Sequence, residues 1–469
     1  MIVFGRHYFF IMKTFRKYLL RALMFLAGEG KMYKEVLING RLFPQKTNPV
    51  KLIKLLKFAR DNVNYYKLNF PKISFNPKGF LKAFGKLNFY TDKTFLKSNI
   101  YDFVDPKYHS CVKNLYESKS VFSYLKNILR GKFLLSFSTS GSSGHPLNYF
   151  KDKRTGLRMI LQFLETGKYF GWREGEVFFS CFQKGAYFDI GILNSIVKYM
   201  GLPIFVFDQI DSENCERYFK LINKMKPTAL MGFPSYLAEF AHYRIKNKIK
   251  IESPIKIVIC VGEMLTESQK KFLELSYQTT VCNLYGASEA QMLALSCKKN
   301  KGLHVFENFA FVENDKKKNI VVTTMEQYDM PLIKYRTNDT GTVVERKCPC
   351  GISGKMITKL EGRIEEFLIN GSGKKVYSSY LRQVLMETNE KFGDVIVQTQ
   401  FAQKKNLTLE FVMELIKKDK AKDIVNYISG MLKKELKIKV KGKIVPNLVQ
   451  KKGKFHFLIQ KKEAWKKVR

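Results

Sequence analysis

The sequence predicts an α/β protein, in which a large N-terminal domain with mostly parallel sheets and helices precedes a small α+β domain. The chain has 469 residues, of which 45% are hydrophobic, and this is enough for more than one buried core. From residue 177 onward, apolar strand patterns alternate with helical patterns, which is typical of a parallel sheet buried on both faces. After about Leu360 the chain becomes Lys-rich and its pattern changes, so we expect a second, smaller unit there.

The first elements expected are an N-terminal extension and an amphipathic helix. Residues 1–50 are interpreted as a helical extension packed on the large domain. In the alternative, the basic helix over residues 13–26 makes a peripheral contact with an anionic membrane. Neither apolar run in this segment is long enough to span a membrane. Apolar residues at helical spacing predict a helix over residues 50–66.

The alternating part of the chain predicts a regular series of strands and helices. A helical pattern also covers residues 155–163, and a helix start lies near Thr91. We expect strands at 177–179, 204–207, 229–231, 255–261 and 280–284, helices at 190–200, 212–225, 235–246 and 266–276, and later strands at 305–312, 320–324 and 341–345.

The charge is strongly positive, with 82 Lys and Arg against 41 acidic residues and a net charge of +41. Such a surface attracts nucleotides, nucleic acid or anionic membranes. The basic residues are spread along the chain, and no aromatic and basic motif of an RNA-binding module is present. We therefore interpret them as a solvated surface and expect no specific nucleic acid partner. The eight cysteines form no secreted disulfide pattern, so a reducing, cytoplasmic location is expected.

A Ser- and Gly-rich loop, Phe-Ser-Thr-Ser-Gly-Ser-Ser-Gly-His-Pro at residues 137–146, separates an apolar strand from an extended segment. Small residues let backbone N–H groups point into a shared hollow, and such a nest of donors holds phosphates. The loop is not a Walker motif, since no Gly-Lys-Ser/Thr ends it. The alternative is a solvated hairpin turn.

Four later stretches contain further candidate functional residues. Asn-Leu-Tyr-Gly-Ala-Ser-Glu at 283–289 ends a predicted strand, and ligands bind at such strand ends. Tyr285 offers a flat face to a base, and Glu289 offers an oxygen to magnesium. Tyr-Arg-Thr-Asn-Asp-Thr-Gly at 335–341 places Asp339, which could hold ribose hydroxyls, before a Gly turn. Residues 360–366 form a candidate hinge, and Lys-Lys-Gly-Lys at 451–454 puts a cation on a Gly turn.

In this order, these stretches resemble the ANL superfamily of adenylate-forming enzymes. The likeness is to the phenylacetate–CoA ligase branch, with its coenzyme F390 synthetase and CapK-like relatives, and it runs from about Leu52 to His456. Met-Gly-Phe-Pro-Ser-Tyr-Leu at 231–237 and Val-Gly-Glu at 261–263 are further matches. Each motif alone is weak evidence, and the resemblance is supported by the occurrence of all of them in this order.

The resemblance implies a large domain over residues 1–361, a small mobile domain over 362–469, and a set of site residues. Lys454 would stabilise the reacting phosphate, Arg363 would contact the ribose and phosphate, and Glu365 would be the hinge. The remaining roles would be phosphate binding by Thr139, Ser140, Gly141, Ser142, Ser143 and Gly144; adenine binding by Gly262, Glu263 and Tyr285, with Gly286 and Ser288 beside it; ribose binding by Asp339; magnesium binding by Glu289; and an acyl pocket at Tyr187 and Phe188.

Some residues depart from the pattern of that branch. Glu365 and Glu366 replace a usual pair of Asp residues at the hinge, and Asn283 stands where Asp is common. The stretch around Tyr187 and Phe188 is also altered, which argues against phenylacetate itself as the substrate.

Cys297, His304, Cys348 and Cys350 form a second constellation. Cys297 is expected after a helix that follows Glu289, and His304 at the start of the next strand. A Cys-Pro-Cys turn with a further Cys and a His fits a tetrahedral zinc site. Four protein ligands leave no open position, so such a zinc would be structural. The alternative is a group of core thiols with a hydrogen-bonded His.

The function expected from this resemblance is ATP-dependent adenylation of a carboxylic acid, followed by transfer of the acyl group to coenzyme A. The partners would be the acid, ATP, Mg²⁺ and CoA. One alternative is an adenylating transferase in capsule or cell-surface polysaccharide synthesis that does not use CoA. Another is a basic protein that binds nucleic acid or membrane. The oligomeric state, a homodimer included, is left open.

Overall fold

The computed structural model describes residues 46–117, 134–138, 147–152, 177–183, 204–207, 212–448 and 457–460, together with Thr155, Gln162 and residues 169–171. Residues 298, 300, 326, 364–366, 394, 417–418 and 447 are gaps within these ranges. The described residues fall into two compact units. The first unit holds those between 46 and 171 and between 284 and 360, and the second holds those between 177 and 283 and between 361 and 460.

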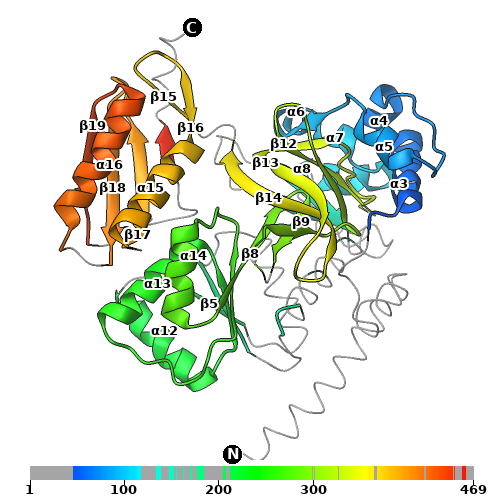
Figure 1. Ribbon diagram of the computed structural model, residues 1–469. Helices are drawn as coiled ribbons and strands as arrows, with labels where there is room; N and C mark the ends of the chain where they lie inside the picture. The colour runs from blue at the N-terminus through cyan, green and yellow to red at the C-terminus, as the bar shows by residue number, and fades with distance from the viewer. Residues whose placement is uncertain are drawn as a thin grey trace, which may run out of the picture. The chain divides into compact units, whose positions relative to one another are not determined.

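Short helices form the N-terminal part of the first unit (Figure 1). The helix expected over residues 50–66 is two helices, because Val63 is extended and Asn62 donates its side-chain amide to the Phe58 carbonyl oxygen, competing with the backbone. The helices are α3 (Pro49–Asn62), α4 (Asn64–Asn69), α5 (Phe80–Gly85), α6 (Lys93–Ser98), α7 (Ile100–Phe103), the 3₁₀ helix η2 (Pro106–Tyr108) and α8 (His109–Glu117).

The sheet of the first unit is mostly antiparallel. Its strands lie in the order β11-β12-β13-β14-β10-β9-β8, with β1 parallel to β13. They are β1 (Thr91–Asp92), β8 (Thr280–Ala287), β9 (Gln291–Ser296), β10 (Leu303–Val305), β11 (Ala310–Asn314), β12 (Asn319–Thr324), β13 (Tyr335–Lys347) and β14 (Ser353–Arg363), and a separate hairpin pairs β2 (Leu134–Ser138) with β3 (Asn148–Asp152).

The sequence misplaced two strand boundaries in this sheet. The strand expected over 305–312 is interrupted by a turn at 307–309, where the Glu307 carboxylate accepts hydrogen bonds from Thr47 and from the Lys355 backbone. The strand expected over 341–345 runs from Tyr335 to Lys347. Asp339 therefore lies within a strand and not before a Gly turn.

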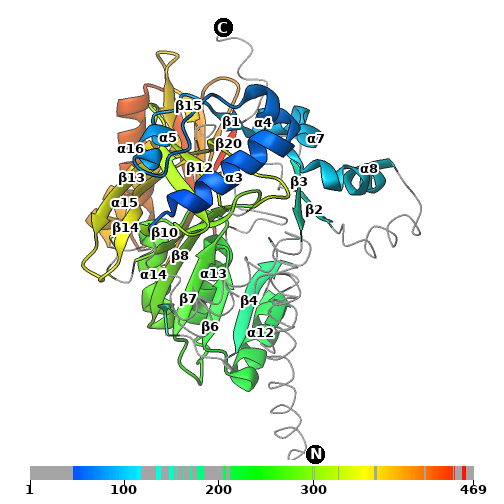
Figure 2. The same cartoon turned by 90° about the vertical axis from the view of Figure 1, so that its right-hand side faces the viewer.

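The second unit contains the parallel sheet that the alternating pattern predicted. Its parallel strands lie in the order β7-β6-β4-β5, and α13 and α14 pack side by side with each other. Figure 2 shows the strands beside α12 and α13. The elements are β4 (Phe178–Gln183), β5 (Ile204–Phe207), α12 (Ser212–Met225), β6 (Ala229–Gly232), α13 (Pro234–Lys246), β7 (Ile257–Val261) and α14 (Glu267–Tyr277).

The C-terminal part of the second unit is the expected α+β structure. Its sheet has the order β19-β18-β17-β20, and α15 and α16 cover one face (Figure 1). The elements are β15 (Phe367–Ile369), β16 (Lys375–Tyr377), α15 (Ser378–Phe392), β17 (Ile396–Gln403), β18 (Leu409–Leu415), α16 (Ala421–Leu436), β19 (Val440–Ile444) and β20 (Leu458–Gln460). Among the described helices, none has both the length and the apolar character needed to cross a membrane.

Candidate functional site

The two strands that flank the Ser- and Gly-rich loop pair with each other. β2 and β3 are antiparallel, and Ser138 stands opposite Asn148. The ends of the loop are therefore held together, as in a hairpin. The loop itself lies outside the described residues, as do other predicted site residues, and their roles stay predictions. The residues concerned are Thr139, Ser140, Gly141, Ser142, Ser143, Gly144, Tyr187, Phe188, Glu365 and Lys454.

The candidate adenine and ribose residues of the first unit lie in direct contact. The Tyr285 hydroxyl donates to Asp339 Oδ2 at 2.8 Å, and Thr337 Oγ1 lies 3.4 Å from the same hydroxyl. Tyr285 is on β8 and Asp339 is on β13, so two separate strands bring them together. The residues predicted to bind adenine and ribose are therefore direct neighbours.

Three backbone features shape this contact. Asn338, just before Asp339, has a φ of 63°, a left-handed conformation that Asn tolerates better than most residues. The register of β12 against β13 also shifts near Asn319. At Gly286, beside Tyr285, an added Cβ would lie 2.3 Å from the Gln291 carbonyl oxygen. Only glycine fits where β8 and β9 approach this closely.

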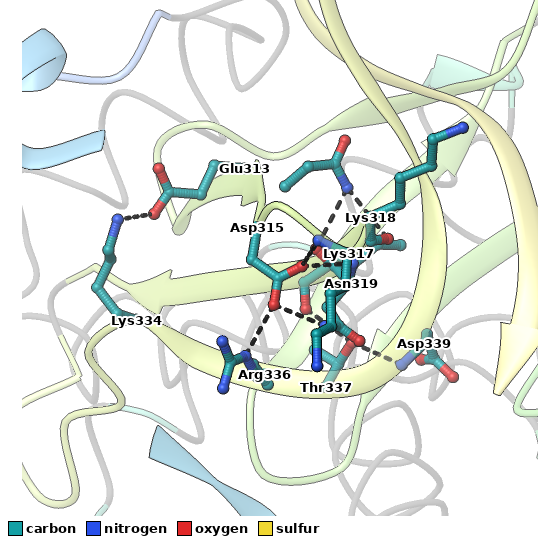
Figure 3. A network of polar contacts seen from close by, with 11 residues as sticks. Glu313, Asp315, Lys317, Lys318, Asn319, Lys334, Arg336, Thr337 and Asp339 are labelled. Atoms are coloured by element: carbon teal, nitrogen blue, oxygen red, sulfur yellow. Dashed lines mark hydrogen bonds and ion pairs between the residues drawn. The ribbon is translucent and has the colours of Figure 1, made fainter. Parts of the chain in front are cut away.

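A network of charged and polar residues surrounds Thr337 and Asp339 on β13 (Figure 3). Arg336 donates to Asp315 Oδ2 at 2.8 Å, and Asn319 donates its side-chain amide to the same oxygen at 2.6 Å. Burial raises the pKa of Asp315, but hydrogen bonds from Asn319, Lys317 and Arg336 together hold it below its usual value. Thr337 donates to the Ile320 carbonyl oxygen. These hydrogen bonds therefore restrict the conformation of β13 around Thr337.

Glu289, the candidate magnesium ligand, is 6% exposed, and the hydroxyl of the fully buried Tyr335 donates to its Oε1. Burial and the neighbouring Glu289 carboxylate raise the pKa of Tyr335 well above its usual value, so Tyr335 stays a donor. One carboxylate oxygen is thus oriented by Tyr335. An oriented carboxylate oxygen of this kind is a suitable ligand for magnesium.

Lys151 is a residue that sequence reasoning missed. It is 1% exposed on β3, and its Nζ donates to the Ser288 carbonyl oxygen at 2.8 Å. It thereby ties the strand after the Ser- and Gly-rich loop to the stretch that carries Ser288 and Glu289. In a chain with 82 Lys and Arg residues, no sequence signal could have separated this lysine from the others.

The same strand ends in a buried pair of carboxylates. Asp329 Oδ2 accepts a hydrogen bond from the Asp152 backbone at 2.7 Å, and Tyr108 donates to Asp152 Oδ2 at 3.1 Å. Burial, and then the charge of Asp152, raise the pKa of Asp329 to about 7. The pair anchors the end of β3.

Gly262 and Glu263 lie in the second unit, at the carboxyl end of β7. The Glu263 carboxylate accepts a hydrogen bond from the Ser235 backbone at 3.3 Å, at the first turn of α13. Helix α13 has no capping side chain of its own, so Glu263 supplies an acceptor for its free N–H groups. The two matched stretches at 231–237 and 261–263 therefore meet. Arg363, also in this unit, is the last residue of β14.

The cysteines and histidine of the second constellation come together in the first unit. One ligand atom from each of Cys297, His304, Cys348 and Cys350 lies within 4.8 Å of all the others. The Sγ atoms of Cys297 and Cys348 are 3.3 Å apart, and His304 Nε2 is 3.1 Å from Cys350 Sγ. A tetrahedral zinc with Zn–S bonds of about 2.3 Å separates two thiolates by about 3.8 Å. The donor set and its size therefore fit zinc.

The electrostatics of the cluster suit metal binding. Burial, with a smaller effect of Arg346, lowers the pKa of His304 to about 4, so its ring is neutral. Burial raises the pKa of the Cys297 thiol, but hydrogen bonds from the Lys301 and Lys299 backbones and from neighbouring thiols bring it below the ordinary value. The pKa of Cys348 is raised to about 11, first by burial. Cys297 is therefore the first of this pair to become a thiolate.

The elements around the cluster differ from those expected. Cys297 follows strand β9, where a helix was expected after Glu289, and His304 lies in the middle of β10 and not at its start. Cys348 and Cys350 lie in the turn between β13 and β14, where the Gly351 backbone donates to the Cys348 carbonyl oxygen.

The chain matches, over residues 137–318, the family model described as "AMP-binding enzyme". Among curated proteins it is similar to an indoleacetate–lysine synthetase of Pseudomonas savastanoi, with 23% identity over 42% of this chain and 48% of the relative. It is also similar to a phenylacetate–coenzyme A ligase of Thermus thermophilus, with 25% identity over 37% and 42%. The protein CapK of Staphylococcus aureus is 26% identical over 34% and 36%. The matched regions thus span about half the length of these relatives or less.

Solved structures show the fold over nearly the whole chain. A 2-hydroxyisobutyryl-CoA ligase in the postadenylation state, in complex with 2-HIB-AMP, matches with a TM-score of 0.68 and 16% identity over 90% of both chains. The same ligase in complex with 2-HIB-AMP and CoA matches with a TM-score of 0.54. The resemblance to adenylate-forming enzymes and the α/β fold class are therefore confirmed.

Proposed function

We propose that this protein is an AMP-forming carboxylic-acid ligase. The carboxylate of the acid attacks the α-phosphorus of ATP, the bond to the bridging oxygen breaks, and pyrophosphate leaves with that electron pair. The product is an acyl adenylate. The contact between Tyr285 and Asp339, within reach of one nucleoside, is the observation that best supports this proposal. The matching AMP-binding region and the ligase fold support it further.

The candidate residues take distinct roles in this reaction. Asp339 holds the ribose hydroxyls, Tyr285 lies against adenine, and residues 139–144 hold the phosphates. Glu289 holds Mg²⁺, which supplies charge neutralisation at the phosphates when bound. Arg363 and Lys454 bring positive charge to the phosphate, where negative charge develops during the reaction.

We propose CoA as the acceptor of the acyl group, and a movement of residues 362–469 about Glu365 between the two half-reactions. The CoA complex of the fold neighbour and the phenylacetate–coenzyme A ligase relative support this choice. The relative that joins indoleacetate to lysine makes an amine the second candidate acceptor. A saccharide precursor, the acceptor in the alternative expected from the sequence, is the third candidate.

A single assay separates these acceptors. Pyrophosphate release is measured over a panel of aliphatic and aromatic acids, with no acceptor, with CoA, with lysine, or with a nucleotide sugar. An acid-dependent release that CoA stimulates, with formation of a thioester, is the expected result. Asp339→Ala should abolish most of the release, whereas Asp61→Asn, on an exposed residue of α3, should leave it intact. If no acid in the panel releases pyrophosphate, the proposal is wrong.

We also propose that Cys297, His304, Cys348 and Cys350 hold a structural zinc. All four ligands belong to the protein, so the ion would have no free position for a substrate.

A further inference from the structure

His242 and Glu414 form a polar contact within the second unit, although they are far apart in sequence. His242 lies on α13, and Glu414 lies on β18 of the C-terminal part. His242 Nδ1 contacts Glu414 Oε1 directly. An ionised carboxylate can only accept, so Nδ1 carries the proton and donates.

Glu414 is buried, with 2% of its surface exposed. Along β18, Phe411, Met413 and Leu415 enter the core beneath α15 and α16, so Glu414 lies on the opposite face of the sheet. Helices α13 and α14 pack against the neighbouring strand β17. Burying a carboxylate is costly unless hydrogen bonds satisfy both oxygens, so the contact with His242 has a stabilising role that a surface pair would lack.

The second oxygen of Glu414 holds the chain that leaves β19. Oε2 accepts a hydrogen bond from the Leu448 backbone at 2.9 Å, and Gln398 donates to the Leu448 carbonyl oxygen at 3.1 Å. Val445 donates its backbone N–H to the Met413 carbonyl oxygen. Leu448 lies only a few residues before Lys454 in the sequence. One carboxylate thus links α13 to the segment that leads to the candidate catalytic lysine.

We propose that His242 and Glu414 form a latch that fixes the C-terminal part on α13 and, through Leu448, holds the start of the segment that leads to Lys454. His242 is a positioning residue, because it acts through Glu414 and touches no reacting atom. Its role in catalysis rests on the proposed ligase function. Because Lys454 is assigned to adenylation, the latch favours the first half-reaction, and it must open if residues 362–469 move for the transfer.

The test compares two replacements of His242. His242→Ala removes the donor, whereas His242→Asn keeps an N–H close to the Nδ1 position. Glu410→Gln is the matched control, since Glu410 lies on the same strand and forms an ion pair with Lys404. Hydrogen exchange of the full-length protein reports the latch without any substrate.

In His242→Ala, exchange over residues 445–448 should rise about ten- to a hundredfold, the range for losing a hydrogen bond to a charged group. Adenylation of an accepted acid, measured by pyrophosphate release, should slow by about tenfold or more. Transfer from a supplied acyl adenylate should stay within about twofold. His242→Asn should restore both the exchange and the adenylation rate.

Two results would overturn the latch: exchange over 445–448 that equals that of Glu410→Gln, or faster exchange throughout the second unit with both half-reactions slowed equally. If the wild-type protein adenylates no acid, the ligase proposal fails by itself. In that case the hydrogen-exchange measurement by itself tests whether His242 and Glu414 hold residues 445–448.

Discussion

Removal of the proposed zinc should destabilise the first unit. The four candidate ligand atoms lie within 4.8 Å of one another, in the turn between β13 and β14, just after β9 and in the middle of β10. A metal that binds only the folded chain, at 100 to 1,000 times its dissociation constant, stabilises the fold by about 2.7–4.1 kcal/mol. For a unit of this size, this corresponds to a loss of about 5–15 °C in melting temperature when the metal is removed.

The assay combines elemental analysis with thermal unfolding. The purified protein should contain about one zinc per chain, and a strong chelator should lower the melting temperature by the amount given above. Re-addition of zinc should restore it. Cys348→Ser/Cys350→Ser should lose the metal, whereas Cys111→Ser, at a buried thiol outside the cluster, should keep it. A protein that contains no zinc, or a double variant with unchanged metal content, would refute the reasoning and leave these residues as core thiols.

Three further outcomes follow from the geometry of the first unit. Asp339→Ala should weaken ATP binding about tenfold in calorimetry, because a hydrogen-bonding carboxylate is lost; unchanged affinity would exclude it from the ribose site. Gly286→Ala should cost about 1–3 kcal/mol in urea unfolding, because the new Cβ would lie 2.3 Å from the Gln291 carbonyl oxygen. The control Gly430→Ala, in helix α16 with open space around the new Cβ, should slightly raise the free energy of unfolding. Asp329 has a pKa of about 7 in the folded state against an ordinary value of 3.8, so the folded state holds the extra proton and its stability should fall as pH rises from about 4 to about 7. Asp329→Asn should flatten this decline, and an unchanged slope in melting temperature would contradict the assignment.

The sequence predicted the regular part of the second unit closely. The helix expected at 212–225 is α12, and the helix expected at 235–246 is α13 with one more residue. Hydrophobic periodicity predicts these boundaries because each helix buries one face and the strands between them are buried. The prediction was poorer at 50–66, where the side chain of Asn62 ends α3, since periodicity alone does not report such local competition.

The residues of the candidate nucleotide site could be predicted from the sequence, but their arrangement in space could not. Tyr285 and Asp339 were both singled out, yet their contact depends on the order of strands in the sheet. Lys151 and His242 could not be found, because each acts through a partner far away in the sequence. Short sequence motifs indicate local requirements, such as a tight turn. Buried polar contacts between distant residues depend on the three-dimensional arrangement of the strands and are not visible in such motifs.

The cluster of Cys297, His304, Cys348 and Cys350 was predicted although its surrounding elements were not. The register of the sheet explains why the four residues meet although the elements around them were predicted wrongly. His304 pairs with Leu295 on β9 and with Met356 on β14, so β10 brings the ends of both neighbours together. Strand β13 then runs without interruption from Tyr335, which orients Glu289, to the turn that begins at Cys348. Because Asp339 in the middle of this strand is also held by Tyr285 and Thr337, a metal at the far end would stabilise the strand without setting the position of the carboxylate.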